Sequence, residues 1–163
     1  MKTGDRFDIP HEGESWHIVR SAIHDGPPFI ADVTIAAGKG PPTHFHEHED
    51  EVIEVFEGSV TFFMPDGPHE VKAGERFTIP RGTPHSFKTG AQGMRGRGVY
   101  DGVHFEGFVA QLPPGDKKGF IRLAQHATAT NWIGSRLTSP LLRAFFHVLG
   151  KGGWLFGVRR RIV

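Results

Sequence analysis

Two histidines in alternate positions, His44 and His46, together with Glu51 and a distant His85, constrain the fold of this chain more than any other feature. Side chains two residues apart on a strand point the same way, so both imidazoles can aim at one point. Glu51 lies an odd number of residues further on, so an acidic turn must redirect the chain before its carboxylate can join them. His85 follows a turn rich in proline and glycine. We therefore expect short strands and tight turns to bring the four side chains together.

The donor types indicate which ions such a cluster would bind. Imidazole and carboxylate without thiolate suit Fe, Mn, Ni, Cu or Zn as the divalent ion, and the chain has no cysteine. Four protein ligands on an octahedral ion leave two positions open, whereas four on a tetrahedral zinc leave none. We predict one divalent transition metal bound by His44, His46, Glu51 and His85, of unspecified identity. The alternative is that these are surface or core histidines of a barrel without metal.

Three further histidines were weighed as donors. His48 could shift the pair to His46 and His48, but no glutamate then falls at the right offset, so we expect it to be exposed or beside the site. His69 and His104 could lie near a pocket, although surface positions are the stronger expectation.

Residues 1–112 have the pattern of short strands separated by turns, consistent with 22 glycines and 12 prolines in 163 residues. Residues 29–36 alternate between apolar and polar side chains, as a half-buried strand does. After the turn, Glu51, Ile53 and Val55 should face inward. The other predicted strands are 16–21, 43–46, 51–57, 59–64, 70–72, 76–79, 86–89 and 97–101. This punctuation predicts a mainly β antiparallel barrel or jelly roll.

Some side chains outside the cluster were assigned to the interior or the rim of the barrel. Arg95 or Arg97 could reach the barrel mouth and bind an anion, although a solvated strand edge is the simpler expectation. Phenylalanines are expected to fill the barrel, with one or two lining a pocket: Phe45, Phe62, Phe63, Phe77 and Phe87.

The pattern changes to helical periodicity near residue 104, and residues 113–163 are predicted to form a helical C-terminal extension. Apolar side chains at 105, 108, 109 and 112 recur at helical spacing, 119–130 could form a short helix, and 141–149 form a clearer one after Ser139 and Pro140. The apolar stripe should pack on the barrel or on a partner subunit. Its basic end could instead lie on an anionic membrane surface.

Composition and the two ends of the chain narrow the remaining choices. The net charge of +1, with both signs interspersed, argues against nucleic-acid binding. The first residues lack an apolar signal-peptide core, and no apolar run is long enough for a confident membrane span. We expect a cytoplasmic protein with one domain and an appendage.

The spacing of these residues resembles the two motifs of the cupin superfamily. The first motif is matched by Gly38, His44, His46, Glu51 and Gly58, and the second by Gly74, Pro80, Gly82 and His85. The last position of the second motif, usually asparagine, is Thr89 here, which puts some hydrogen bonding of that motif in doubt rather than the metal. The resemblance covers roughly residues 29–101.

This resemblance implies a cupin double-stranded β-helix with the four residues as metal ligands, in a chain that we expect to be a homodimer. The leading expectation is a metal-dependent oxidoreductase of the dioxygenase type, acting on a small oxygen-rich or aromatic substrate. Glu51 would serve as a ligand and, on detaching, as a catalytic base. The alternatives are a non-catalytic small-molecule binding or sensor domain, and an isomerase or epimerase that uses the metal as a Lewis acid.

Overall fold

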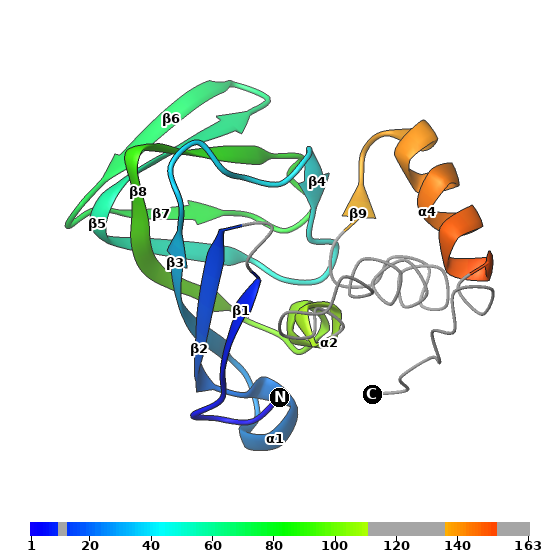
Figure 1. Ribbon diagram of the computed structural model, residues 1–163, viewed down its shortest axis with the longest axis horizontal. Coiled ribbons are helices and arrows are strands. Elements are labelled where there is room, and N and C mark those ends of the chain that lie inside the picture. The colour runs from blue at the N-terminus through cyan, green and yellow to red at the C-terminus, as the bar shows by residue number, and fades with distance from the viewer. Residues whose placement is uncertain (10–12, 111–135, 153–163) are drawn as a thin grey trace.

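Antiparallel strands form most of the structure, a computed structural model that describes residues 1–9, 13–110 and 136–152 (Figure 1). Within these residues the elements in chain order are β1 (Arg6–Ile9), β2 (Glu14–Arg20), α1 (Ala22–Asp25), β3 (Phe29–Ile35), β4 (His44–Phe45), β5 (Glu51–Met64), β6 (Gly67–Lys72), β7 (Arg76–Ile79), β8 (Ser86–Tyr100), α2 (His104–Val109), β9 (Arg136–Leu137) and α4 (Pro140–Gly152).

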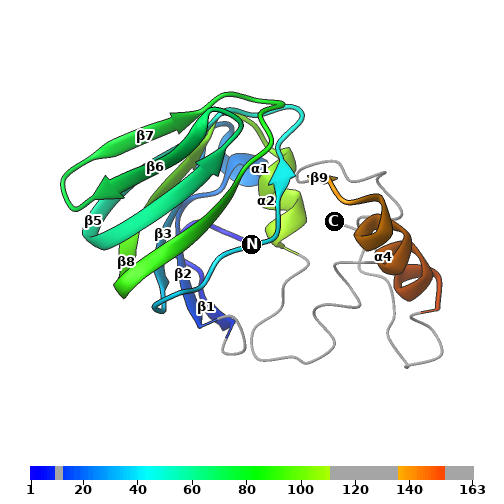
Figure 2. The same ribbon diagram turned by 90° about the horizontal axis from the view of Figure 1, so that it is seen from above.

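The main sheet has the strand order β1-β2-β3-β8-β5-β6, and β7 pairs with β5 as well. All of these pairings are antiparallel, and the strands curl around a common interior, which Figure 2 shows from above. The two longest strands, β5 and β8, lie side by side and set the position of the site, because Glu51 is directly opposite Tyr100. The mainly β jelly-roll architecture predicted from the sequence is confirmed.

Strand β5 is continuous across Gly58, where the sequence pattern predicted a break between two strands. Its register against β8 shifts on both sides of this residue, so the strand is bulged rather than ended. Gly58 has a φ of 74°, and a Cβ there would lie 2.1 Å from the carbonyl oxygen of Gly93 on β8. Only glycine fits so close to the neighbouring strand. The strands predicted at 86–89 and 97–101 are likewise one strand, β8.

The interior follows the predicted alternation on β3 and β5. On β3 the buried residues alternate from Phe29 to Ile35, and on β5 the inward side chains of Glu51, Ile53 and Val55 are buried. Phe62 is also buried in the barrel. Phe63 is not, since its side chain is 47% exposed, and the prediction that it fills the barrel is wrong. Adjacent residues of a strand point to opposite faces, so Phe62 and Phe63 cannot both face inward.

The other predicted barrel phenylalanines are partly buried. Phe77 and Phe87 pack against the core, and Phe62 contacts both rings at centroid distances of 5.3 and 5.7 Å. Phe45 lies on β4 and is half-buried.

The C-terminal part of the described chain returns to the barrel through β9. This strand pairs antiparallel with β4, matching His44 with Leu137, and α4 follows it (Figure 1). The helix predicted at 141–149 is confirmed and runs from Pro140 to Gly152. The predicted helix at 119–130 and the predicted domain boundary at residue 112 lie outside the described residues. Within the described part of the chain, no helix is long and apolar enough to span a membrane.

Candidate metal centre

Three histidines converge at one end of the barrel. One ring nitrogen of each of His44, His46 and His85 lies within 4.8 Å of those of the other two. His44 comes from β4, His46 from the turn that follows, and His85 from the residue before β8. All three are buried, with exposed fractions of 7%, 3% and 1%. The structure therefore brings together the three imidazoles that the sequence singled out.

Glu51, the first residue of β5, completes the predicted set. Its Oε2 atom lies 3.2 Å from Nε2 of His46 and 3.2 Å from Nε2 of His85, and the residue is 3% exposed. The acidic turn before β5 redirects the chain as the strand parity required. The Glu51 carboxylate consequently lies beside two of the three imidazoles in the interior.

Backbone hydrogen bonds hold the histidine segments in register. His44 and His85 form an antiparallel bridge, in which each backbone N–H donates to the carbonyl of the other at 2.9 and 2.8 Å. The N–H of Gly82, in the turn before His85, donates to the His46 carbonyl at 2.6 Å. Gly82 has a φ of 76°, which explains why this turn takes a glycine. The three donors are thus fixed relative to one another by main-chain contacts.

The second ring nitrogens orient two of the imidazoles. Nδ1 of His44 lies 3.0 Å from the Pro42 carbonyl, and Nδ1 of His85 lies 2.9 Å from the Thr83 carbonyl. A carbonyl oxygen can only accept, so Nδ1 carries the proton in each ring. In the neutral ring the Nε2 lone pair is then free to act as a ligand, the arrangement typical of metal-bound histidine.

Two buried atoms of the cluster have no hydrogen-bond partner among the described residues: Glu51 Oε2 and His85 Nε2. They face each other at 3.2 Å, and Nδ1 of His85 is occupied by the Thr83 carbonyl. A cation near both atoms, either a proton on Nε2 of His85 or a metal ion, would satisfy the pair. Bonds of about 2.1 Å to one ion place neighbouring ligands about 3.0–3.4 Å apart, which matches the observed separation. The residues present therefore fit a divalent transition metal.

Burial and mutual proximity keep the donors in the ionisation states that a metal needs. Burial, followed by the charges of His85 and His46, lowers the pKa of His44 to about 3, so its ring is neutral at physiological pH. Burial alone would raise the pKa of Glu51, but the ring nitrogens of His46 and His85 hold it well below its usual value. The site thus holds a neutral His44 imidazole and an ionised Glu51 carboxylate.

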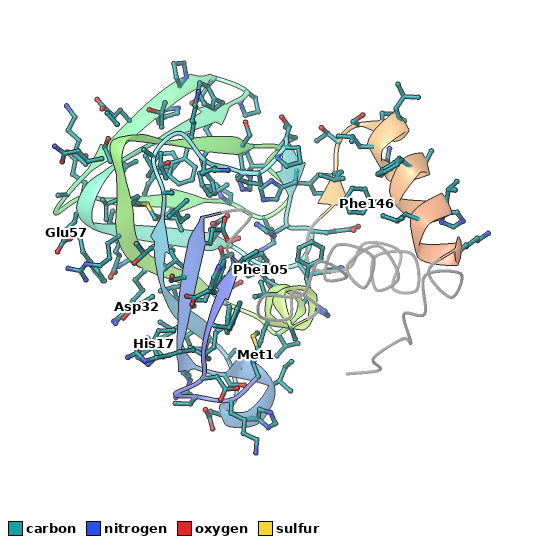
Figure 3. All side chains as sticks on the ribbon, in the orientation of Figure 1. Met1, His17, Asp32, Glu57, Phe105 and Phe146 are labelled. Atoms are coloured by element: carbon teal, nitrogen blue, oxygen red, sulfur yellow. The ribbon has the colours of Figure 1, made fainter. Side chains whose placement is uncertain are left out.

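Two aromatic side chains that the sequence analysis did not single out form a wall of the site. The Tyr100 hydroxyl donates a 2.8 Å hydrogen bond to Oε1 of Glu51, and burial together with the Glu51 charge raises the pKa of Tyr100 well above 10. Phe105 stacks on Tyr100 with ring centroids 3.9 Å apart and meets the His46 ring edge-on at 4.9 Å. It projects from α2 into the barrel region (Figure 3). Their placement depends on strand register and on α2, which residue spacing does not reveal.

Glu49 is a second buried carboxylate that sequence reasoning missed, because it lies in a turn that looks solvent-exposed. It is 1% exposed and accepts hydrogen bonds from the backbone N–H groups of His104 and Phe105 at 2.5 and 2.8 Å. Burial raises its pKa, against the effect of these two donors. Glu49 therefore anchors the start of α2 and, through it, the position of Phe105 beside His46.

An exposed ion-pair network ties together the turns around the site. The Arg81 guanidinium contacts Asp50 at 2.9 Å and Asp101 at 2.6 Å, and the Arg81 backbone N–H also donates to Asp50. Asp50, Arg81 and Asp101 lie in three separate turns, next to Glu49, Gly82 and Gly102 respectively. The network links the loops that carry the donors and the loop that precedes α2.

The remaining histidines lie outside the cluster. His48 is exposed, and its ring lies 4.8 Å from that of the half-buried His104. His69 is on β6, with its side chain 38% exposed and 2.9 Å from Asp66. The surface placement expected for His48 and His69 is confirmed.

The two arginines considered for the barrel mouth are on the outer face of the sheet. Arg97 pairs with Asp32 at 2.7 Å, and Arg95 with Glu57 at 2.5 Å. Both guanidinium groups lie over the Phe56 ring, with the Arg95 carbon 5.4 Å and the Arg97 carbon 5.7 Å from the ring centroid. They are therefore away from the barrel mouth, but on the outer face of an interior strand rather than at the strand edge that the sequence favoured.

Thr89, which stands where the second motif usually has asparagine, forms hydrogen bonds of its own with the loop before β4. Its hydroxyl donates to the Ala36 carbonyl at 2.6 Å and accepts from the Lys39 N–H at 3.0 Å. These contacts hold the loop that leads to β4. The threonine therefore supports the loop without contacting the metal donors.

A barrel of antiparallel strands with a buried cluster of three histidines and one glutamate defines the class of protein: a β-barrel with a candidate metal centre in its interior. A family model described as a cupin domain matches residues 31–95. The chain therefore contains a cupin domain, as the resemblance of its two motifs implied.

Two solved structures with TM-scores above 0.5 share this fold. KdgF from Halomonas sp. is 18% identical over 60% of this chain and 86% of its own, with a TM-score of 0.52. An RmlC-like cupin from Shewanella frigidimarina is 16% identical over 60% and 83%, also with a TM-score of 0.52. The polyketide cyclase RemF from Streptomyces resistomycificus is 30% identical over 60% and 72%, with a TM-score of 0.49. No curated protein matches the sequence.

Proposed function

We propose that this protein is a metal-dependent enzyme acting on a small oxygen-rich or aromatic substrate. The observation that carries the proposal is the convergence of three buried imidazoles beside the Glu51 carboxylate, whose Oε2 lies 3.2 Å from His85 Nε2, both without a hydrogen-bond partner among the described residues. In the proposed site, His44, His46, Glu51 and His85 hold one ion. A structural core would gain nothing from leaving two such atoms unpaired, since each costs free energy when buried.

The ion would supply Lewis acidity and, if it is redox-active, a place for O₂ beside the substrate. The protein's own side chains have separate roles around it. Tyr100 holds Oε1 of Glu51 and leaves Oε2 facing the imidazoles. Phe105 covers the edge of His46 and excludes water from that side. An aromatic wall of this kind suits a flat or apolar part of a substrate.

Within this class we place dioxygenase chemistry first. If the ion is octahedral, four protein donors would leave two positions open, and the ion would supply a place for substrate and O₂ to meet. Glu51 is proposed as a ligand that can also act as a base on detaching, with Tyr100 retaining one of its oxygens. The protein loaded with Fe or Mn should consume oxygen with an enolic or catecholic substrate. Absence of oxygen uptake with all such substrates would remove this chemistry.

Metal binding is tested separately from turnover. The purified protein should retain about one ion per chain after loading and dialysis. His85→Ala and Glu51→Ala should lose it, because each removes a donor that faces the others. His48→Ala is the matched control, since His48 is exposed and outside the cluster. Equal metal retention by all four proteins would refute the site.

The same measurements separate the alternatives. Tightly held zinc without oxygen uptake, combined with small-molecule binding, indicates a binding or sensor domain. Turnover of a sugar-like or hydroxy-carbonyl substrate without oxygen indicates an isomerase or epimerase that uses the metal as a Lewis acid. We further propose a cytoplasmic homodimer. Light scattering coupled to size exclusion measures its mass.

A further inference from the structure

Helix α4 presents part of its apolar stripe to solvent, on the side that is not packed against the described part of its own chain. The exposed fractions are 83% for Leu141, 38% for Leu142, 56% for Phe145 and 71% for Val148. At about 100° per residue, Leu141, Phe145 and Val148 fall within about 60° of arc on the helix surface. We call these four residues the α4 apolar face.

The helix is attached by the side that carries Phe146. This residue is 8% exposed and lies on the side of α4 toward β9 (Figure 3). Strand β9 joins the barrel by pairing with β4, and Thr138 donates its backbone N–H to the Thr43 carbonyl at 3.1 Å. Helix α4 lies beyond β9, away from the main sheet (Figure 1), and Leu141, Phe145 and Val148 on it are exposed.

Charge is divided along the chain in a way that the net value of +1 conceals. Residues 1–116 contain all 18 acidic residues and ten Lys and Arg, a net charge of −8. Residues 117–163 contain nine Lys and Arg and no acidic residue, a net charge of +9. On α4 itself, Lys151 lies nearest to the α4 apolar face, and Arg143 and His147 lie on the far side of the helix.

We propose that the α4 apolar face docks on the surface of an anionic phospholipid membrane. A helix with exposed leucine and phenylalanine on one face, cations on its other sides and no carboxylate fits the boundary between headgroups and acyl chains. Anionic lipid attracts the cationic part of the chain, and the acidic barrel is repelled, so the barrel faces the solution. A nucleic acid would use the cations but not the aliphatic side chains. The inference does not depend on the metal chemistry.

Vesicle co-sedimentation of the full-length protein tests this. The protein should bind phosphatidylcholine vesicles that contain phosphatidylserine and bind pure phosphatidylcholine vesicles far less, with binding weakened by salt. Phe145→Gln combined with Val148→Gln should reduce binding by about tenfold or more. Phe63→Gln is the matched control, because Phe63 is a similarly exposed phenylalanine, 47% against 56%, on the barrel. It should bind like the unaltered protein.

Three results would overturn the proposal. One is equal binding to both vesicle types, and another is unchanged binding of the doubly substituted variant. The third is tighter binding to a DNA or RNA oligonucleotide than to anionic vesicles. If the α4 substitutions instead convert a dimer to a monomer, with no vesicle binding by either protein, the face is an interface between two copies.

Discussion

Tyr100 connects strand β8 to the candidate metal centre through a single hydrogen bond. It is the only tyrosine in the chain, and its hydroxyl is buried against Glu51. Because Glu51 is a proposed ligand, the hydroxyl decides which carboxylate oxygen is available to an ion. Tyr100 is thus a positioning residue in the proposed site.

Tyr100→Phe should weaken metal binding more than it disturbs the fold. It leaves Oε1 of Glu51 buried without its donor, which costs about 1–3 kcal/mol of unfolding free energy. The metal dissociation constant should rise, because the carboxylate can rotate. Thr89→Val is the control: it removes a buried hydroxyl that contacts Ala36 and Lys39, away from the donors. If both variants keep the original metal affinity, Tyr100 does not position the ligand.

The His44 pKa predicts how the metal-free protein responds to acid. The unfolded chain takes up a proton at His44 near pH 6.5, whereas the folded chain does so only near pH 3. Between these values the unfolded state binds more protons, so stability falls as the pH is lowered through this window. Thermal unfolding of metal-free protein at pH 7 and pH 5 measures the loss. It should be smaller in His44→Gln, and an equal loss in both proteins would contradict the assignment.

At the scale of elements, the start of α2 depends on close contact between Glu49 and Gly102. A Cβ at Gly102 would lie 2.5 Å from a carboxylate oxygen of Glu49. That carboxylate cannot move without losing its bonds to the N–H groups of His104 and Phe105. The glycine therefore permits the contact that places α2, and with it Phe105, beside the site.

Gly102→Ala should destabilise the protein by about 1–3 kcal/mol, the usual cost of overpacking a buried contact. Gly107→Ala should have the opposite effect on stability. Nothing lies within 4 Å of a Cβ at Gly107, and the residue is inside α2. That change should stabilise by about 0.5–1 kcal/mol, because alanine loses less conformational freedom in a helix. Urea denaturation of the two variants compares them directly. A stable Gly102→Ala would mean that Glu49 does not need its observed position.

The donors were predictable from sequence because they depend on strand parity and turn chemistry, which are local. His44 and His46 share a face through the period of two, and the prolines and glycine before His85 mark a turn. The residues around the donors were not predictable in this way. Tyr100 reaches Glu51 because the register of β8 against β5 brings together two residues that are 49 positions apart in the sequence. Glu49 is buried because α2 begins over it. The burial of Phe63 was predicted wrongly, although strand parity allows only one of the adjacent Phe62 and Phe63 to face inward.

For the whole molecule, metal binding and folding should be linked. An ion that binds only the folded chain stabilises it by about 2.7 kcal/mol when its free concentration is 100 times the dissociation constant. The unfolding temperature should therefore rise with the logarithm of metal concentration and fall after treatment with a chelator. Glu51→Ala should show no such rise, because it lacks a donor. A rise of equal size in that variant would place the stabilising ion elsewhere.

The position of β4 between two partners has a consequence for the order in which the protein is made. His44 pairs with His85 on one side and with Leu137 on the other. All four donors leave the ribosome before β9 does, and the 52 residues from His85 to Leu137 take about 3–10 s to synthesise. During that interval the donors can meet while the outer edge of β4 is still unpaired. The nascent chain can thus capture its ion first and close that edge afterwards.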